Sequence, residues 1–305
     1  MSALLGAMQG AAAQGVLWGI MVLGVYITYK LLDIADLTVD GSFALGGCVC
    51  AILVANKIVD PVTALFLSAM AGVLAGAVTG ILHTLFEIPA ILAGILTQIA
   101  LWSVNLRVMG GKSNVPLLKE KTLISGFVDM TGMKQSQGAL IIGIIVAVAT
   151  IAILYWFFGT ELGCSLRATG CNPNMSRAQG INTDVCKVLG LMISNGLVAL
   201  SSALLAQYQG FADVNMGRGA IVIGLAAVII GEAIFGKIFH NFALRLLSVA
   251  FGSILYYLVL QTVIWMGIDT DLLKMLSALV VAVFLAVPYW KAKYFSKPVK
   301  RGGNK

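Results

Sequence analysis

The residues of this chain that could carry chemistry are few and widely spaced. The two histidines, His83 and His240, lie far apart, and no pair of cysteines has the Cys-x-x-Cys spacing. A zinc site needs closely spaced Cys and His ligands, and a disulfide framework needs regularly spaced cysteines. We therefore predict no metal site and no disulfide framework, and we expect no membrane-embedded enzyme either. The five cysteines are Cys48, Cys50, Cys164, Cys171 and Cys186.

One segment has the ending of a nucleotide-binding motif. Gly111-Lys112-Ser113 is similar to the last residues of a P-loop, but Leu106 occupies the position of the required first glycine. That glycine allows the backbone to surround the phosphates, and another residue blocks it. We predict that this chain binds no nucleotide cofactor and does not hydrolyse ATP.

Acidic residues beside long apolar stretches are candidates for a transport path. A carboxylate at bilayer depth costs about 2.5 to 3.5 kcal/mol. Asp36 lies with Asp33 and Asp40 at the junction of two apolar stretches, where it is either at the cytoplasmic edge of the membrane or on the path. Glu232 lies near the end of another stretch and could pair with Lys237. A proton or sodium site at Asp36 or Glu232 would indicate an ion-coupled transporter.

Uncharged polar residues within the apolar stretches have two interpretations. They can form hydrogen bonds between helices, each contributing about 0.6 kcal/mol, or they can line a translocation path. Asn195 and Gln98 lie near the middle of their stretches, so we predict that they line the path together with Asp36. The remaining residues of this kind are Asn105, Gln207 and Gln261.

The composition requires that these residues lie in a membrane protein. The chain has 305 residues, of which 59% are hydrophobic and only 11% are charged, whereas soluble domains carry about 25% charged residues. We predict an all-α polytopic fold with about nine transmembrane helices, eight to ten being allowed at about 20 residues each. The predicted spans are Met8–Lys30, Gly41–Asn56, Pro61–His83, Pro89–Arg107, Gly138–Gly159, Val185–Gln209, Arg218–Gly236, Ala243–Trp265 and Asp271–Trp290. Because Gly41–Asn56 is short, we expect that residues 31–40 are partly drawn into the membrane.

The basic residues set the orientation. The net charge of +7 indicates cytoplasmic loops here rather than nucleic-acid binding, because Lys and Arg concentrate on the cytoplasmic side of membrane proteins. We predict a single transmembrane domain over residues 1–290 and a basic cytoplasmic tail over residues 291–305. With nine spans, the amino terminus then lies on the outer side of the plasma membrane. The tail either anchors this topology or binds membrane lipid; its cations are Lys291, Lys293, Lys297, Lys300, Arg301 and Lys305.

Small residues predict where helices approach closely. Gly72, Gly76 and Gly80 repeat every four residues, a spacing that lets the backbones of two helices come together. Two interpretations remain, a subunit interface and packing inside one bundle, and the second is favoured.

An internal repeat is also indicated. The segment Ala35–Gly46 aligns loosely with Ala212–Gly224, and each follows the first span of a four-span block. The blocks cover about residues 8–107 and 185–290, with one linker span at residues 138–159 between them. An odd number of intervening spans places the blocks in opposite orientations, as in the inverted repeats of transporters, where the substrate route lies near the repeat interface.

The connecting loop at residues 160–184 is predicted to contain a short helix with capping residues at both ends. Asn172 suits the N-cap, Pro173 suits the first helical position and Gly180 suits the C-terminal stop. Arg167 precedes this helix and Arg177 lies within it. A rigid helix outside the membrane could fit a groove on a motor subunit, whereas an idle loop needs no such caps.

The residues from Arg167 to Asn182, RATGCNPNMSRAQGIN, resemble the cytoplasmic loop of ABC-importer permeases of the branched-chain amino acid, ribose and nucleoside type. Segments 24–47 and 217–231 are also similar to that family, and the closest subgroup is suspected of carrying aromatic amino acids. Two positions differ from the family pattern, Ser176 in place of alanine and Glu232 in place of a second glycine.

The resemblance implies a permease subunit that moves a small solute, an amino acid of the branched-chain or aromatic kind. It implies a homodimer, two separate ATPase subunits that bind the ATP and Mg, and an extracytoplasmic binding protein. It also implies that Arg167, Asn172, Pro173, Arg177 and Gly180 couple the permease to the ATPase. The loop at residues 108–137, with Lys112, Lys119 and Lys121, would help to dock the binding protein.

Overall fold

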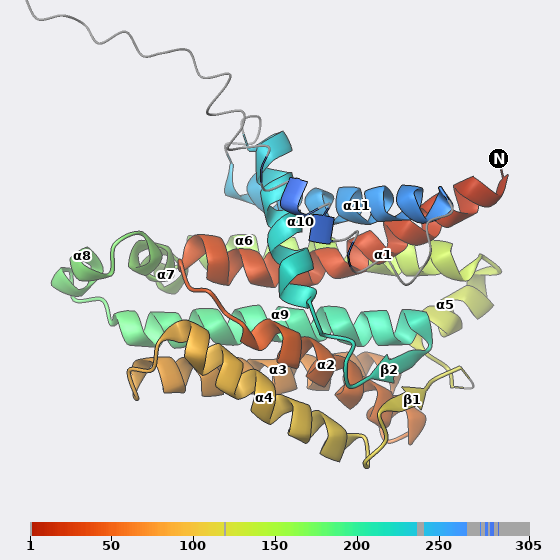
Figure 1. Cartoon of the computed structure of the whole chain (residues 1–305), viewed down its shortest axis with the longest axis horizontal. Helices are drawn as coiled ribbons and strands as arrows, with labels where there is room; N and C mark the ends of the chain where they lie inside the picture. Colours follow the sequence, from red (N-terminus) through yellow and green to blue (C-terminus); the bar gives the residue numbers. More distant parts are fainter. Residues whose placement is uncertain are drawn as a thin grey trace, which may run out of the picture.

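The computed structural model describes residues 2–118, 120–236 and 241–266, with a few positions between 275 and 286. This part of the chain is an all-α bundle with one small β-ribbon (Figure 1). Seven helices are long and apolar enough to cross a membrane, and a shorter apolar helix accompanies them. The chain is therefore a polytopic membrane protein, as its composition predicts.

The elements of the first half are mostly long helices. The π-helix η1 continues α1 directly, and α3 starts with a proline at its first turn, where a missing N–H costs nothing. The elements are α1 (Ser2–Tyr26), η1 (Ile27–Leu31), α2 (Thr38–Ala55), α3 (Pro61–Thr84), α4 (Ala90–Val108), β1 (Asn114–Pro116) and α5 (Leu123–Thr131).

The second half begins with an apolar helix, and the chain then extends beyond the end of the bundle. Two short helices, α7 and α8, separate the long helices α6 and α9. The elements are α6 (Gln135–Gly159), α7 (Glu161–Cys171), α8 (Pro173–Ala178), α9 (Thr183–Gln209), β2 (Phe211–Asp213), α10 (Ala220–Phe235) and α11 (Phe242–Trp265).

The observed helices agree with most of the predicted spans. Seven predicted spans coincide with the seven span-length helices. The predicted span Arg218–Gly236 contains α10, whose 16 residues are fewer than the roughly 20 that cross a bilayer. The predicted span Asp271–Trp290 lies almost entirely outside the described residues, and the tail at residues 291–305 lies wholly outside them.

Helix α9 runs through the middle of the bundle, with α2, α3 and α4 on one side and α1, α6 and α11 on the other (Figure 1). The three glycines of α3 face it. A Cβ atom on Gly72 would collide with the carbonyl oxygen of Asn195, and one on Gly76 with that of Leu191. A Cβ on Gly80 would lie 2.9 Å from the Cα of Val188. The glycine face of α3 therefore packs inside the bundle.

The two ends of the bundle differ. Helices α7 and α8 project from one end, while α5 and the antiparallel pair β1 and β2 lie at the other (Figure 1). In the ribbon, Val115 pairs with Ala212, so it joins the segment after α4 to the segment after α9. Gly210 ends α9 with a positive φ of 76°, a conformation that glycine adopts without strain.

Residues 32–37 interrupt the helical structure between η1 and α2. Two backbone hydrogen bonds link the start of this segment to η1. Leu32 N donates to Ile27 O at 3.0 Å, and Ile34 N donates to Thr28 O at 2.9 Å. Glycines of three other helices allow a close approach to the segment: Gly170 of α7, Gly190 of α9 and Gly94 of α4. Other helices therefore cover part of this non-helical segment.

The glycine packing of α3 against α9 can be tested with one added methyl group. We expect Gly76→Ala to lower the free energy of unfolding by about 1–3 kcal/mol, because the new Cβ collides with the backbone of α9. Thermal denaturation of the purified protein in detergent measures the change. Gly159→Ala is the matched control, since a Cβ there meets nothing within 4 Å. Equal melting temperatures for the two variants would contradict this packing.

Candidate functional site

The predicted short helix in the connecting loop is α8. The Oδ1 atom of Asn172 accepts a hydrogen bond from the backbone N–H of Met175 at 3.0 Å, and Pro173 occupies the first helical position. Gly180 follows the helix with a positive φ of 81°. The caps thus lie where the sequence predicted them, and they define a helix of six residues at the end of the bundle.

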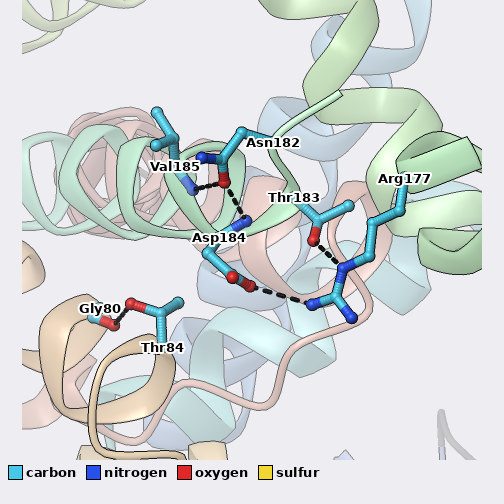
Figure 2. Close-up of polar contacts among 7 residues, drawn as sticks. All are labelled: Gly80, Thr84, Arg177, Asn182, Thr183, Asp184 and Val185. Carbon is cyan, nitrogen blue, oxygen red and sulfur yellow. Dashed lines mark hydrogen bonds and ion pairs between the residues drawn. The ribbon is translucent and has the colours of Figure 1, made fainter. Parts of the chain in front are cut away.

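Arg177 fixes α8 to the first turn of α9 (Figure 2). Its Nε donates to Thr183 Oγ1 at 2.7 Å, and its Nη2 donates to Asp184 Oδ1 at 3.2 Å. Asn182 caps α9 at the same place by accepting from the backbone N–H groups of Asp184 and Val185. About half of each charged side chain is exposed, so the ion pair contributes at most about 1 kcal/mol. Its importance is geometric, because it sets the position of α8 relative to α9.

Arg167 lies apart from this arrangement. It is on α7, and its guanidinium carbon lies 5.0 Å from the centre of the Phe242 ring. The structure thus brings Asn172, Pro173, Arg177 and Gly180 together and places Arg167 against α11.

Met175 of α8 is a further candidate residue that the sequence motif does not single out. Met175 is 61% exposed at the tip of the molecule, whereas the neighbouring Ser176 is buried and donates to Asn172 O at 3.0 Å. Met175 thus gives this short capped helix an apolar side chain on its outer surface. A methionine within an otherwise polar helix could have revealed it from the sequence.

Two of the three predicted path residues meet in a buried polar cluster. Asp36 is only 2% exposed. Its Oδ1 accepts from the backbone N–H of Thr38 at 2.9 Å, and its Oδ2 accepts from Asn195 Nδ2 at 2.7 Å. The hydroxyl groups of Thr38 and Thr79 are 2.7 Å apart beside them. The cluster joins the break at residues 32–37 to the central helix α9, so Asp36 is not at an exposed edge.

Gln98 lies elsewhere, in the wall of a cavity of about 290 Å³. Asp40 lines the same cavity and holds the start of α10 by accepting from the backbone N–H groups of Gly219 at 3.0 Å and Ile221 at 2.9 Å. The other lining residues are Gly41, Ala44, Ile99, Trp102, Ser103, Asn105, Val214 and Arg218. The positions of Gln98, Trp102 and Asn105 on one face of a helix follow from their spacing, but that they face Arg218 does not.

Glu232 pairs with Lys30 at 3.2 Å, and both side chains are partly exposed. The Lys237 pairing expected from the sequence lies outside the described residues. Glu232 therefore forms a partly exposed ion pair near the end of α10 and takes no part in the hydrogen bonds of the Asp36 and Asn195 cluster. Within the described ranges, no group of three His, Cys, Asp or Glu residues could hold a metal ion.

Comparison with known proteins relates this arrangement to a transport family. The sequence profile of the family described as branched-chain amino acid transport system / permease component matches residues 7–287. The chain is 41% identical to a tyrosine transport system permease protein of Clostridioides difficile, with 90% of this chain and 88% of that protein aligned. It is 35% identical to an uncharacterised protein of Rickettsia prowazekii over 87% of this chain and 92% of that protein.

A more distant similarity covers about half of the chain. The autoinducer 2 import system permease protein LsrC of Salmonella typhimurium is 26% identical over 52% of this chain and 44% of that protein. No solved structure matches the chain significantly.

The hydrogen bond between Asp36 and Asn195 can be tested by a double-mutant cycle. We expect Asn195→Ala to lower the free energy of unfolding by about 1–3 kcal/mol, because it removes a donor from a buried carboxylate. Asp36→Ala combined with Asn195→Ala should cost less than the sum of the single changes. Thermal denaturation in detergent measures all three variants. Strict additivity would show that the two side chains do not interact.

Proposed function

Because the chain belongs to the family of permease components of branched-chain amino acid transport systems, we propose that it imports an aromatic amino acid as the membrane subunit of an ABC importer. The chain is a permease component of an ABC-type transport system, not an enzyme itself. The substrate proposal rests on one observation, the 41% identity to a tyrosine transport permease over 90% of the chain.

Helix α8 is the proposed contact with a separate ATPase, which supplies the ATP and Mg site. Three features support this role: the caps at both ends, the exposed Met175, and the attachment of Arg177 to α9. An ATPase that moves α8 would displace the first turn of α9 directly, since Arg177 bonds to Thr183 and Asp184 there. Arg167 would then hold α7 against Phe242 of α11 rather than contact the ATPase.

The proposed location is the plasma membrane, with α7, α8 and the carboxyl terminus in the cytoplasm. The β-ribbon and α5 then lie outside, where a solute-binding protein delivers the solute. Lys112 and Lys121 belong to this outer region, and Lys119 lies outside the described residues. Met130 and Leu118 in the same region are also exposed. A surface with both basic and apolar side chains suits the docking of another protein.

Two inverted four-helix repeats are the proposed architecture, and a pair of matching turns supports it. Asp36 accepts from the N–H of Thr38 two residues later at 2.9 Å, and Asp213 accepts from the N–H of Asn215 at 2.7 Å. These aspartates occupy aligned positions in the two repeat segments. Each turn follows a long helix, α1 or α9, and precedes a shorter one, α2 or α10.

A second copy of the chain is the proposed partner in the membrane, giving one permease for each of two ATPase subunits. The outward faces of α3 and α4 carry large exposed apolar residues that membrane lipid or a second copy would cover. On α4 they include Ile91, Leu92, Leu96 and Val104, whereas the exposed Ile99 and Trp102 line the cavity beside Gln98.

Reconstituted transport tests the proposed function. We expect vesicles that contain this permease, its ATPase and its binding protein to accumulate L-tyrosine only with ATP and Mg, because the energy comes from the ATPase. Radiolabelled uptake is the measurement, and vesicles loaded with ADP are the control. Uptake that continued without ATP and collapsed with the ion gradient would contradict the proposal and indicate an ion-coupled transporter.

The contact at α8 can be tested separately. We expect Met175→Glu to weaken ATPase binding at least about tenfold, because a charge replaces an apolar side chain at the centre of the interface. Co-purification and the ATPase rate of the complex measure the effect. Met266→Glu is the matched control, since Met266 is 70% exposed and follows the last residue of α11, at the other end of that helix from Phe242. An intact complex with Met175→Glu would contradict this contact.

A further inference from the structure

The cavity around Gln98 has the shape of a small ligand site. Its walls come from the first half of α2, the second half of α4 and the segment that leads into α10. The volume of about 290 Å³ is just below the usual range for ligand pockets, about 300–1,000 Å³. It therefore suits one small solute such as a single amino acid.

Charges of both signs border this cavity. Arg218 is exposed and takes part in none of the ion pairs found among the described residues. A free guanidinium at a cavity wall can bind a carboxylate with two parallel hydrogen bonds. The position of Arg218 is set by Asp40, whose carboxylate accepts from the N–H of the next residue, Gly219, at 3.0 Å.

A buried polar atom in the wall lacks a partner. Asn105 is 1% exposed, and its Oδ1 has no hydrogen-bond partner within the part of the chain that the structure describes. Its Nδ2 donates only weakly to Gly41 O at 3.4 Å. A buried acceptor without a donor is costly, so this position favours a ligand with N–H groups. The carboxylate of Asp40 in the same cavity selects a cationic group among such donors.

An aromatic surface completes the site. Trp102 lies on α4 between Gln98 and Asn105, and its side chain is 47% exposed. Exposed tryptophan beside polar groups offers a face for stacking with another ring. The cavity thus combines a carboxylate binder, an ammonium acceptor and an aromatic platform.

We propose that this cavity binds the zwitterion of an aromatic amino acid. Arg218 binds its carboxylate, Asn105 Oδ1 accepts from its ammonium group, and Trp102 packs against its ring. The inference rests on the proposed import of an aromatic amino acid. It adds that the permease itself recognises the solute after the binding protein has released it.

Direct binding tests the site without the binding protein. Radiolabelled L-tyrosine is titrated onto the purified complex of permease and ATPase in lipid nanodiscs. We expect Arg218→Gln to weaken tyrosine binding at least about tenfold, because a charge-assisted pair is lost. We expect Trp102→Leu to weaken it about fivefold through lost ring stacking. Arg107→Gln and Trp156→Leu are the matched controls, since both residues are exposed and lie outside this cavity.

The role of Asn105 has its own readout. Competition with 3-(4-hydroxyphenyl)propionate, which lacks the ammonium group, should be weak in the natural protein. The preference for tyrosine over this compound should decrease in Asn105→Leu. Thermal denaturation of each purified complex verifies that the variants are folded.

Different results would contradict the proposed function and the proposed binding site. If the natural complex takes up no tyrosine, the proposed function and the ligand class are overturned together. If the natural complex takes up tyrosine but Arg218→Gln and Trp102→Leu bind it like the controls, the site is overturned and the proposed function stands.

Discussion

The structure depends on the requirement that backbone polar groups inside a membrane find partners within the protein. Residues 32–37 leave the helical structure between η1 and α2, so their N–H and C=O groups need partners other than those of a regular helix. The π-helix η1, the turn at Asp36 and the glycines that face the segment serve this purpose. A polar cluster can therefore exist in the middle of an apolar bundle.

Helix α9 connects this break to the end of the bundle that carries α7 and α8. Its first turn holds Arg177 through Thr183 and Asp184, and Asn195 on the same helix holds Asp36. At 1.5 Å per residue, the two contacts are about 17 Å apart along the helix. Because α3 packs on α9 through glycines, α9 has backbone contacts on that side along much of its length. A displacement of α8 would thus act on the centre of the bundle through a single rigid element.

Asp40 has a corresponding role on the other side of the break. It lies on α2, and its carboxylate oxygens hold the first N–H groups of α10. The close contact of Gly217 with the backbone of Asp40 keeps the entry to α10 against α2. The cavity lined by Gln98 and Arg218 therefore lies beside the place where α2 holds the entry to α10.

Much of this protein follows from its sequence alone. The apolar runs predict the spans because lipid requires long apolar helices, and Asn172, Pro173 and Gly180 predict α8 because capping is local chemistry. The similarity of residues 167–182 to a known cytoplasmic loop indicates the family. Only the tertiary structure decided that Asn195 meets Asp36, that Gln98 belongs instead with Trp102 and Arg218, and that Arg167 lies against Phe242. These contacts join residues far apart in the chain, and helix packing, which local spacing does not encode, brings them together.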